Sequence, residues 1–330
     1  MTSKNELDML LKNNFKLIAL DVDGTLINND HIVTPRTLRA IKQAKDLGIK
    51  VTIATGRHYP SVIRLARKIQ INAPLICCDG AVIRDIYSND SIYHLLPQEI
   101  AVDIMRMTQS YENFTVKVFI KNGKIYIGQS YKGDYFRKFL SVPFKHSLKG
   151  YFNLLRDFVF IPVQSTGNTQ GAIAALNEPP AKVLVYGNKR PEDLKDFIDE
   201  ILAKYGESIA ITSSMENSID ILNAGISKAK GLVILTEKLG IKRDEIITVG
   251  DNFNDLEMIK YAGLGVAMGN APEQVKNEAD YVTDTNNNEG LAKFLEKLIQ
   301  GQAKTKKLVR CQTKPSAAKE GDTGELFCDV

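Results

Sequence analysis

Two aspartates end an apolar run near the start of the chain, where the sequence LIALDVDGT places Asp21 and Asp23 on either side of a valine. Side chains alternate along an extended strand, so we expect both carboxylates to point to one side, about 6 to 7 Å apart. Like charges at that distance require a cation or a proton between them. An isolated Asp-x-Asp pair also fits a solvated turn, but the preceding apolar run and the following Gly24 favour a site.

A second acidic cluster lies in VGDNFNDLEMI, where Asp251 ends another apolar segment and Asn254 and Asp255 open a helix. Ligands of open α/β sheets bind beyond the carboxyl ends of the strands. Because both apolar segments end in an aspartate, we expect Asp21 and Asp251 to meet at one edge of a sheet. Asp255 alone fits a helix cap equally well.

Groups that could hold an anion occur at two further places. Thr55 and Gly56, in TIATGR, follow another apolar segment and offer a hydroxyl and unhindered backbone NH groups. Lys228, in AGISKAKG, opens a helix, where a cation opposes the helix dipole. A bound phosphate would explain this lysine, and a solvated side chain is the alternative.

Other ion-binding and nucleotide-binding patterns are missing. An EF-hand loop that starts at Asp21 would need glycine and glutamate where Leu26 and Ile32 stand. No GxxxxGK[ST] motif occurs, and GLGVAMG does not satisfy GxGxxG. These observations argue against a calcium loop, a P-loop nucleoside triphosphatase and a dinucleotide-binding domain.

Apolar segments of strand length alternate with segments of helical periodicity over the first part of the chain. Thr34, Pro35 and Gly48 provide the N-cap, the first residue and the stop of the first helix. Such alternation builds a parallel sheet. The predicted strands are 17–20, 50–55 and 73–78, and the predicted helices are 35–47 and 60–69.

The pattern changes in the middle of the chain and then returns. FTVKVFIKNGKIYIG alternates apolar and polar residues around Asn122 and Gly123, which predicts a β-hairpin and therefore an antiparallel sheet. A strand at 181–187, a helix at 191–205 and a strand pair within 209–222 complete a mixed α+β module. From Lys228 the alternation resumes, with helices at 228–239, 254–261 and 289–299 and strands at 245–250 and 264–268.

Bulk composition excludes several classes of protein. Of the 330 residues 44% are hydrophobic and 25% charged, and a net charge of +4 does not demand a polyanion, so we expect no nucleic-acid partner. No run of about 18 apolar residues occurs, and we expect no membrane contact. The four cysteines form no CxxC pair, which argues against a zinc site or a disulfide framework and favours the cytoplasm.

The sequence resembles the haloacid dehalogenase superfamily, in particular its Cof-type phosphatases of subfamily IIB, which carry a C2-type cap. The matching stretches are DVDGT, ATGR, GISK and GDNFNDLEMI followed by AGLGVAMGNAPEQVKNEADYVT, in the family's order, and the similarity spans roughly residues 16–299. The chain departs from the family in three places. Asp79 stands in CCDGA where asparagine is usual, Ala229 stands where glycine is common, and the segment after Gly301 has no recognised counterpart.

The resemblance implies an α/β fold, in which a Rossmann-like doubly wound parallel sheet carries an inserted α+β cap domain. We expect a discontinuous catalytic core at 15–86 and 223–300 and a cap for substrate specificity at 87–222. An N-terminal extension would occupy 1–14 and a flexible C-terminal tail 301–330. Within the cap, residues near Tyr126, Tyr131 or Ser213 are candidates for selecting the substrate.

The resemblance also implies a role for each residue of the site. Asp21 would attack phosphorus to form an aspartyl-phosphate, and Asp23 would act as general acid and base. Mg2+ would bind Asp21, the backbone carbonyl of Asp23 and Asp251. Asp255 would orient the metal's waters or Lys228 from a second layer. The phosphoryl group would be held by Val22, Thr55, Gly56, Lys228 and Asn254.

The predicted function is a Mg2+-dependent phosphatase of small phosphorylated metabolites, with sugar phosphates as the expected class. A phosphomutase or other phosphotransferase of the same fold would pass the phosphoryl group to a sugar instead of water, and the sequence leaves this alternative open. A non-catalytic regulator that binds a phosphometabolite is disfavoured because the nucleophile, its acid partner and the metal ligands are all present. We expect a cytoplasmic protein that is monomeric or weakly dimeric.

Overall fold

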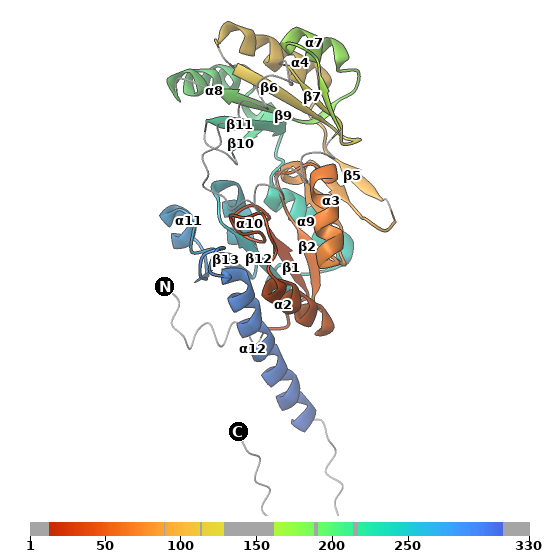
Figure 1. Cartoon of the computed structure of the whole chain (residues 1–330), viewed down its shortest axis with the longest axis vertical. Helices are drawn as coiled ribbons and strands as arrows, with labels where there is room; N and C mark the ends of the chain where they lie inside the picture. Colours follow the sequence, from red (N-terminus) through yellow and green to blue (C-terminus); the bar gives the residue numbers. More distant parts are fainter. Residues whose placement is uncertain are drawn as a thin grey trace, which may run out of the picture.

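A five-stranded parallel sheet lies at the centre of the lower half of the molecule in Figure 1. Its spatial order is β14 (Tyr281–Val282), β13 (Leu264–Ala267), β12 (Ile246–Gly250), β1 (Leu17–Leu20) and β2 (Lys50–Ile53). Every neighbouring pair in this order is parallel. The computed structural model describes residues 13–88, 90–112, 114–128, 162–187, 191–213 and 217–312, with only the backbone of 191 and 304–312.

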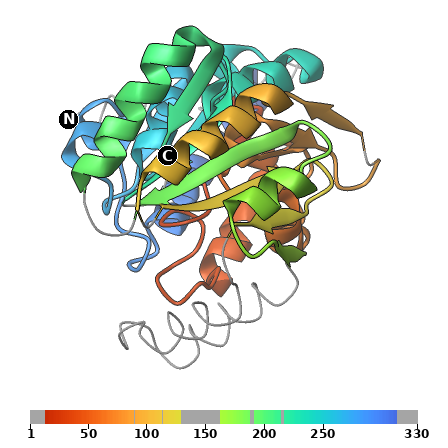
Figure 2. The ribbon, with the colours of Figure 1, turned by 90° about the horizontal axis from the view of Figure 1, so that it is seen from above.

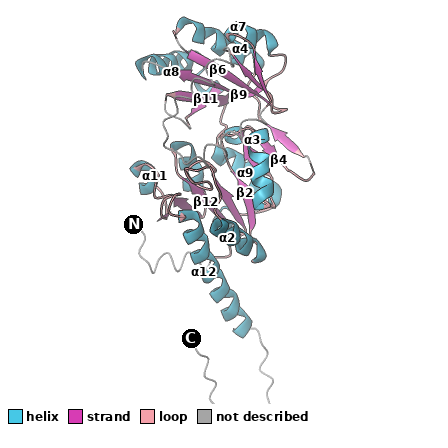
Figure 3. Ribbon diagram, in the orientation of Figure 1, coloured by secondary structure: helices cyan, strands magenta, loops and turns pink. Residues whose placement is uncertain are grey.

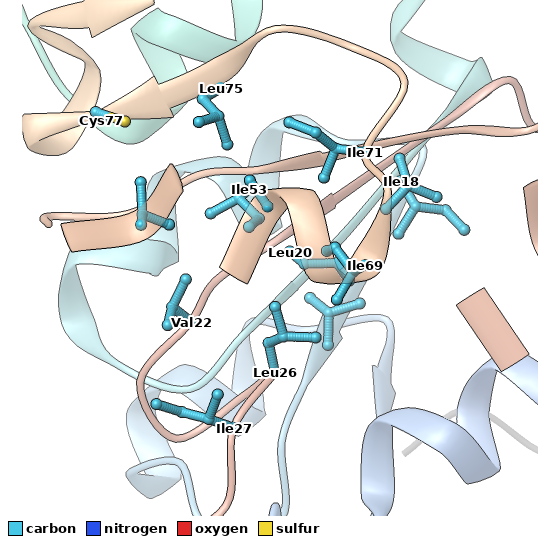
Figure 4. Packing of buried hydrophobic residues seen from close by; sticks show 14 of the residues in the cluster. Ile18, Leu20, Val22, Leu26, Ile27, Ile53, Ile69, Ile71, Leu75 and Cys77 are labelled. Atoms are coloured by element: carbon cyan, nitrogen blue, oxygen red, sulfur yellow. The ribbon is translucent and has the colours of Figure 1, made fainter. Parts of the chain in front are cut away.

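Helices cover both faces of the parallel sheet. They are α2 (Pro35–Asp46), α3 (Tyr59–Ile69), α9 (Lys228–Leu239), α10 (Leu256–Tyr261), α11 (Glu273–Asn277) and α12 (Gly290–Gln312). Successive residues of β1 point to opposite sides. Ile18 and Leu20 therefore pack in the cluster that contains residues of α2, α3 and α12 (Figure 4), whereas Leu17 and Ala19 pack with residues of α9 and α10. The predicted doubly wound α/β class is confirmed.

Helix ends follow local sequence signals at α2 but not at α12. Thr34 Oγ1 accepts a hydrogen bond from the NH of Thr37 at 3.1 Å, with Pro35 as the first helical residue. Helix α12 runs to Gln312, past Gly301, where we expected a flexible tail to begin. Good helix formers such as alanine, lysine, leucine and arginine dominate 302–312 and explain the extension. Residues 313–330 and 1–12 lie outside the described residues.

A small antiparallel sheet continues the edge of the parallel one. It contains β3 (Leu75–Cys77), β4 (Val82–Arg84) and β5 (Ser91–Tyr93). A parallel bridge between Ala54 and Ile76 joins it to the chain that leaves β2. The predicted third strand therefore exists, but it pairs mainly with β4. Among the described helices, none combines the length and the apolar character of a membrane span.

A second sheet lies above the first and has helices on its far side (Figures 2 and 3). We call it, with these helices, the inserted module. Its strand order is β10 (Ile209–Thr212), β11 (Ser218–Asn223), β9 (Pro180–Gly187), β6 (Phe114–Ile120), β7 (Ile125–Ile127) and β8 (Val163–Ser165). Its helices are α4 (Gln98–Met107), α7 (Thr169–Ala175) and α8 (Pro191–Tyr205). The predicted hairpin is present, because β6 and β7 pair antiparallel around Asn122 and Gly123.

The two faces of the module's sheet have different neighbours. Val183 and Val185 of β9 pack in a cluster with Phe197 of α8 and with residues of α4. Leu184, on the other face, belongs to the cluster of the parallel sheet. The module therefore rests on the lower half through the open face of its sheet. The domain boundaries at 87 and 222 remain predictions.

Close packing of α9 generates a first testable expectation. A Cβ at Gly231 would lie 2.7 Å from Ile76 Cγ2 and 2.9 Å from Gly80 Cα. Gly231→Ala should therefore destabilise the protein by roughly 1–3 kcal/mol through overpacking, although alanine inside a helix normally stabilises by about 1 kcal/mol. Chemical denaturation measures the difference. Lys230→Ala, at an exposed position of the same helix, is the control and should stay within about 0.5 kcal/mol; a stabilised Gly231→Ala protein would contradict the packing.

Candidate active site

The carboxyl ends of β1 and β12 lie side by side because the two strands pair in register. The NH of Asp21 continues the ladder by donating to the carbonyl of Val249 at 2.9 Å. Asp21 and Asp251 each follow their strand directly. One carboxylate oxygen from each, together with one from Asp255, lies within 4.8 Å of the others. The structure thus brings Asp21 and Asp251 to one edge of the sheet, as the strand ends predicted.

Asp255 is held in place by the turn that follows β12. It ends the short 3-10 helix η5 (Phe253–Asp255), and its Oδ2 accepts hydrogen bonds from the NH groups of Asp251 and Asn252, both at 3.0 Å. Its Oδ1 accepts from Lys228 Nζ at 2.6 Å. Both carboxylate oxygens of Asp255 are therefore used by this chain. Its geometry is that of a positioning group that also caps a helix.

Lys228 lies between two of the acids. Ser227 caps α9 by accepting the NH of Lys230, which places Lys228 as the first helical residue. The side chain of Lys228 is 2% exposed, and Nζ donates to Asp21 Oδ1 at 2.6 Å as well as to Asp255. Burial opposes the charge, but the two carboxylates outweigh it and raise the pKa of Lys228. The lysine stays charged and is not solvated.

The acids outnumber the cations here. Burial, and then the charge of Asp255, raise the pKa of Asp21 well above its usual value. The same two causes raise the pKa of Asp251 to about 7. Such shifts mean that, without a further cation, protons replace the missing positive charge. One oxygen from each of Asp21, Asp251 and Asp255 could together hold a metal ion.

A tight turn after β1 brings the chain against Asp251. Gly24 has a φ of +84°, and a Cβ at this residue would lie 2.1 Å from Asp251 Oδ2. Thr25 Oγ1 donates to Asp251 Oδ1 and Asn270 Nδ2 donates to Oδ2, both at 3.0 Å. These contacts fix the orientation of the carboxylate. Sequence reasoning missed Thr25 and Asn270, although Thr25 belongs to the DVDGT motif.

Asp23 has a different setting from the one we expected. β1 ends at Leu20, and Asp23 lies in the turn, where the carbonyl of Val22 accepts the NH groups of Leu26 and Ile27 at 3.1 Å. The expectation of two aspartates on one extended strand is therefore wrong. The half-exposed Asp23 carboxylate accepts from Arg57 Nε at 2.7 Å and from its Nη2. Desolvation raises the pKa of Asp23, but Arg57 outweighs it and lowers the pKa overall.

Three of the candidate phosphate ligands, Thr55, Gly56 and Asn254, lie beside Asp79. Thr55 is buried, and its Oγ1 accepts the NH of Arg57 at 3.1 Å. Gly56 follows it, and Asn254 Nδ2 donates to Asp79 Oδ1 at 3.1 Å. Asp79 lies in η1 (Cys78–Gly80), directly after β3. The structure therefore gathers Gly56 and Asn254 around one buried carboxylate, which sequence reasoning noted only as a departure from the family.

A cavity of about 320 Å³ lies between the lower half of the molecule and β10 of the inserted module. Ser213, one of the residues proposed to select the substrate, contributes to its wall. Tyr126 does not, because its side chain is buried in the module's hydrophobic cluster. Tyr131 lies outside the described residues. The lining residues are Asp79, Ala210, Ile211, Thr212, Ser213, Ile226, Ser227, Lys228, Phe253, Asn254 and Glu257.

The chain is similar in sequence to a known family of hydrolases and to phosphatases within it. The model of the family described as haloacid dehalogenase-like hydrolase matches residues 18–295. The chain is 31% identical, over 85% of its length and 94% of the relative's, to the 5-amino-6-(5-phospho-D-ribitylamino)uracil phosphatase YcsE of Bacillus subtilis. It is 26% identical, over 85% and 97% of the two lengths, to the pyridoxal phosphate phosphatase YbhA of Escherichia coli.

Solved structures show the same likeness in three dimensions. A haloacid dehalogenase-like hydrolase from Bacillus subtilis superposes with a TM-score of 0.73 at 29% identity, covering 86% of this chain and 99% of that one. A haloacid dehalogenase-like hydrolase from Bacteroides thetaiotaomicron gives a TM-score of 0.70 at 28% identity, with the same coverage. Because each superposition covers 86% of this chain and 99% of the other chain, the similarity includes both the parallel sheet and the inserted module.

The raised pKa of Asp251 predicts how stability changes with pH. An acid whose folded pKa is raised stabilises the fold below its unfolded pKa and loses that contribution as the pH rises through its folded pKa. Relative to Asp251→Asn, the metal-free wild-type protein should therefore lose stability between pH 3.8 and about 7. The slope for one proton is at most about 1.4 kcal/mol per pH unit. Urea denaturation in EDTA across this range measures it, and parallel curves for the two proteins would contradict the shift.

Proposed function

Because the chain belongs to the haloacid dehalogenase-like hydrolase family and is one of its phosphatases, we propose that it hydrolyses small phosphorylated metabolites with Mg2+ through an aspartyl-phosphate on Asp21. One observation carries the proposal. Lys228 holds Asp21 Oδ1 at 2.6 Å, and among the described residues Oδ2 has no hydrogen-bond partner. A carboxylate fixed at one oxygen and open at the other is suited to nucleophilic attack.

The donor groups fit the proposed metal. Mg2+ prefers oxygen ligands and is commonly bound through one or two carboxylates. Asp255 accepts from the Lys228 ammonium and from two backbone NH groups, whereas each oxygen of Asp251 accepts from one neutral side chain. We therefore assign Asp21 and Asp251 as the carboxylate ligands, with the backbone carbonyl of Asp23 as the third proposed ligand. When bound, the ion would supply the positive charge that offsets repulsion between Asp21 and the phosphate.

Asp21 and Asp23 have different proposed roles in the two steps of the reaction. Asp21 attacks phosphorus, the bond from phosphorus to the leaving oxygen breaks, and Asp23 gives its proton to that oxygen. In the second step Asp23 takes a proton from the water that cleaves the acyl-phosphate and regenerates Asp21. The phosphoryl oxygens would be held by the NH of Val22, by Thr55 and Gly56, and by the side chains of Lys228 and Asn254.

Arg57 adds a requirement to the role of Asp23. Its guanidinium keeps the carboxylate ionised, which is the correct state for taking a proton from water. For the first step Asp23 must gain a proton, and withdrawal of Arg57 when the substrate binds would permit this. We therefore propose that Arg57 controls the protonation of Asp23: the carboxylate is ionised while Arg57 is paired with it and can take up a proton when Arg57 moves away.

We propose a sugar phosphate as the class of substrate. Support for a sugar phosphate comes from the resemblance and from a cavity wall that mixes hydroxyl, amide and carboxylate groups from Thr212, Ser213, Asn254 and Glu257. The two curated relatives are named for a phosphoribitylamino-uracil and for pyridoxal phosphate. Screening phosphorylated metabolites for released phosphate, with product analysis, separates hydrolysis from transfer to a sugar.

The proposed location is the cytoplasm, which is supported by two buried free thiols, Cys77 and Cys78. Burial raises the pKa of Cys78 to about 12, so it remains a thiol. The proposed partner is the small phosphorylated substrate. A monomeric or weakly dimeric state remains a prediction.

The nucleophile assignment predicts the effect of a single substitution. Asp21→Asn should lower hydrolysis of an aryl phosphate by at least about 10³-fold, because an amide cannot form the acyl-phosphate. The fold should survive, since the amide oxygen still accepts from Lys228. Asp46→Asn, which changes an exposed acid paired with Lys42, is the control and should retain activity. Turnover by Asp21→Asn near the wild-type rate would remove Asp21 from the mechanism.

The metal assignment predicts reversible loss of activity. EDTA should abolish phosphate release and Mg2+ should restore it, because Asp21 must approach an anion. Asp251→Asn should need at least about tenfold more Mg2+ for half of its maximal activity. The shift of the melting temperature with Mg2+ gives a readout that does not depend on turnover. Full activity in chelator would reject the metal.

A further inference from the structure

Lys182 of β9 is a buried lysine of the inserted module. Its side chain is 2% exposed, yet its ammonium contacts three acceptors. Nζ lies 2.8 Å from the carbonyl oxygen of Gly56, 2.9 Å from Asp79 Oδ2 and 2.8 Å from Asp220 Oδ1. The contacts to Gly56 and Asp79 are hydrogen bonds, and the contact to Asp220 is an ion pair. Gly56 and Asp79 belong to the lower half of the molecule, whereas Asp220 belongs to β11 of the module.

The direction of Lys182 follows from the alternation of β9. Val183 and Val185 face the helices of the module, so Lys182 and Leu184 face the parallel sheet. Phe119 of β6 shields the ammonium, with its ring centre 5.2 Å from Nζ. Lys182 is therefore a charge that the module inserts into the lower half of the molecule, beside the turn of Thr55 and Gly56.

Asp79 connects this lysine to the candidate phosphate site. It has a φ of +52°, and Cys78 before it has a φ of +49°. Residues other than glycine keep this conformation only where their surroundings hold them. Asp79 is held through Oδ2 by Lys182 and through Oδ1 by Asn254 Nδ2 at 3.1 Å. Burial raises the pKa of Asp79, but Lys182 and Lys228 outweigh it and keep the carboxylate ionised.

Asn254 is the end of this chain of contacts. Its amide has two NH groups, and the one that donates to Asp79 fixes the plane of the amide. Asn254 lines the same cavity as Lys228, and both are proposed ligands of the phosphoryl group. The orientation of Asn254 is thus determined by a carboxylate that is itself oriented by a lysine of the module.

We propose that Lys182 is a positioning residue of the phosphate site, which acts from the inserted module through Asp79 on Asn254. The inference rests on the proposed function of this site. By linkage, a phosphate that binds Asn254 also favours the placement of the module that inserts Lys182. A buried ion pair that merely joined two layers would affect stability and not phosphate affinity.

The test measures binding of inorganic phosphate in the presence of Mg2+ by calorimetry, so it does not require turnover. Asp79→Gly removes the bridging carboxylate at a positive φ that glycine adopts freely, and Lys182 keeps Asp220 and Gly56 as partners. Asp79→Gly and Lys182→Met should each weaken phosphate binding about tenfold, the effect of losing a charge-assisted hydrogen bond. In an Asn254→Ala background neither should weaken it by more than about threefold.

Lys121→Met is the matched control, because Lys121 pairs with Glu178 inside the module at 3.0 Å. It should bind phosphate as the wild type does. If Lys182→Met leaves two buried aspartates unpaired and does not fold, Asp79→Gly alone decides the outcome.

Equal losses in the wild-type and Asn254→Ala backgrounds, or unchanged phosphate affinity in folded Asp79→Gly, would overturn the inference while leaving the phosphatase proposal intact. A wild-type protein that binds phosphate with the expected coupling but releases none from any ester would uphold the inference and reject the proposed function.

Discussion

An excess of negative charge at the ends of two adjacent strands is the constraint on which the other features of the site depend. Pairing of β1 with β12 brings Asp21 and Asp251 together, and the turn after β12 adds Asp255. Lys228 supplies one positive charge to this group. Because like charges in a buried setting repel strongly, the cluster is stable only with bound protons or a bound cation.

The surrounding structure holds these charges in place. Ser227 sets the start of α9, so Lys228 enters the cluster from a fixed helix end. The turn at Gly24 lets the chain approach Asp251 more closely than any other residue would allow. The helix cap at Ser227 and the turn at Gly24 are local features, but the sheet brings them together from segments about two hundred residues apart. The parallel sheet therefore acts as the frame of the site.

The sequence predicted those features that depend on local order along the chain. Alternation of strands and helices predicted the α/β class, and the aspartates after two apolar strands predicted their meeting. It could not predict the partner of Asp23, because a single arginine in a loop carries no signal of where its side chain will lie. Lys182 was missed for a related reason, since a lysine within a strand normally faces solvent. Its burial depends on the packing of two sheets, which local periodicity does not describe.

The contact between Lys182 and Asp79 has a consequence for exchanging parts among relatives. In a chimera whose inserted module came from a relative with an apolar residue at the position of Lys182, the Asp79 carboxylate would have lost this counter-charge. Such a graft would be tolerated more readily if the acceptor chain carried asparagine at residue 79, which needs no cation. An exchange of the inserted module would therefore keep the charge balance of this junction only if residues 79 and 182 were exchanged together.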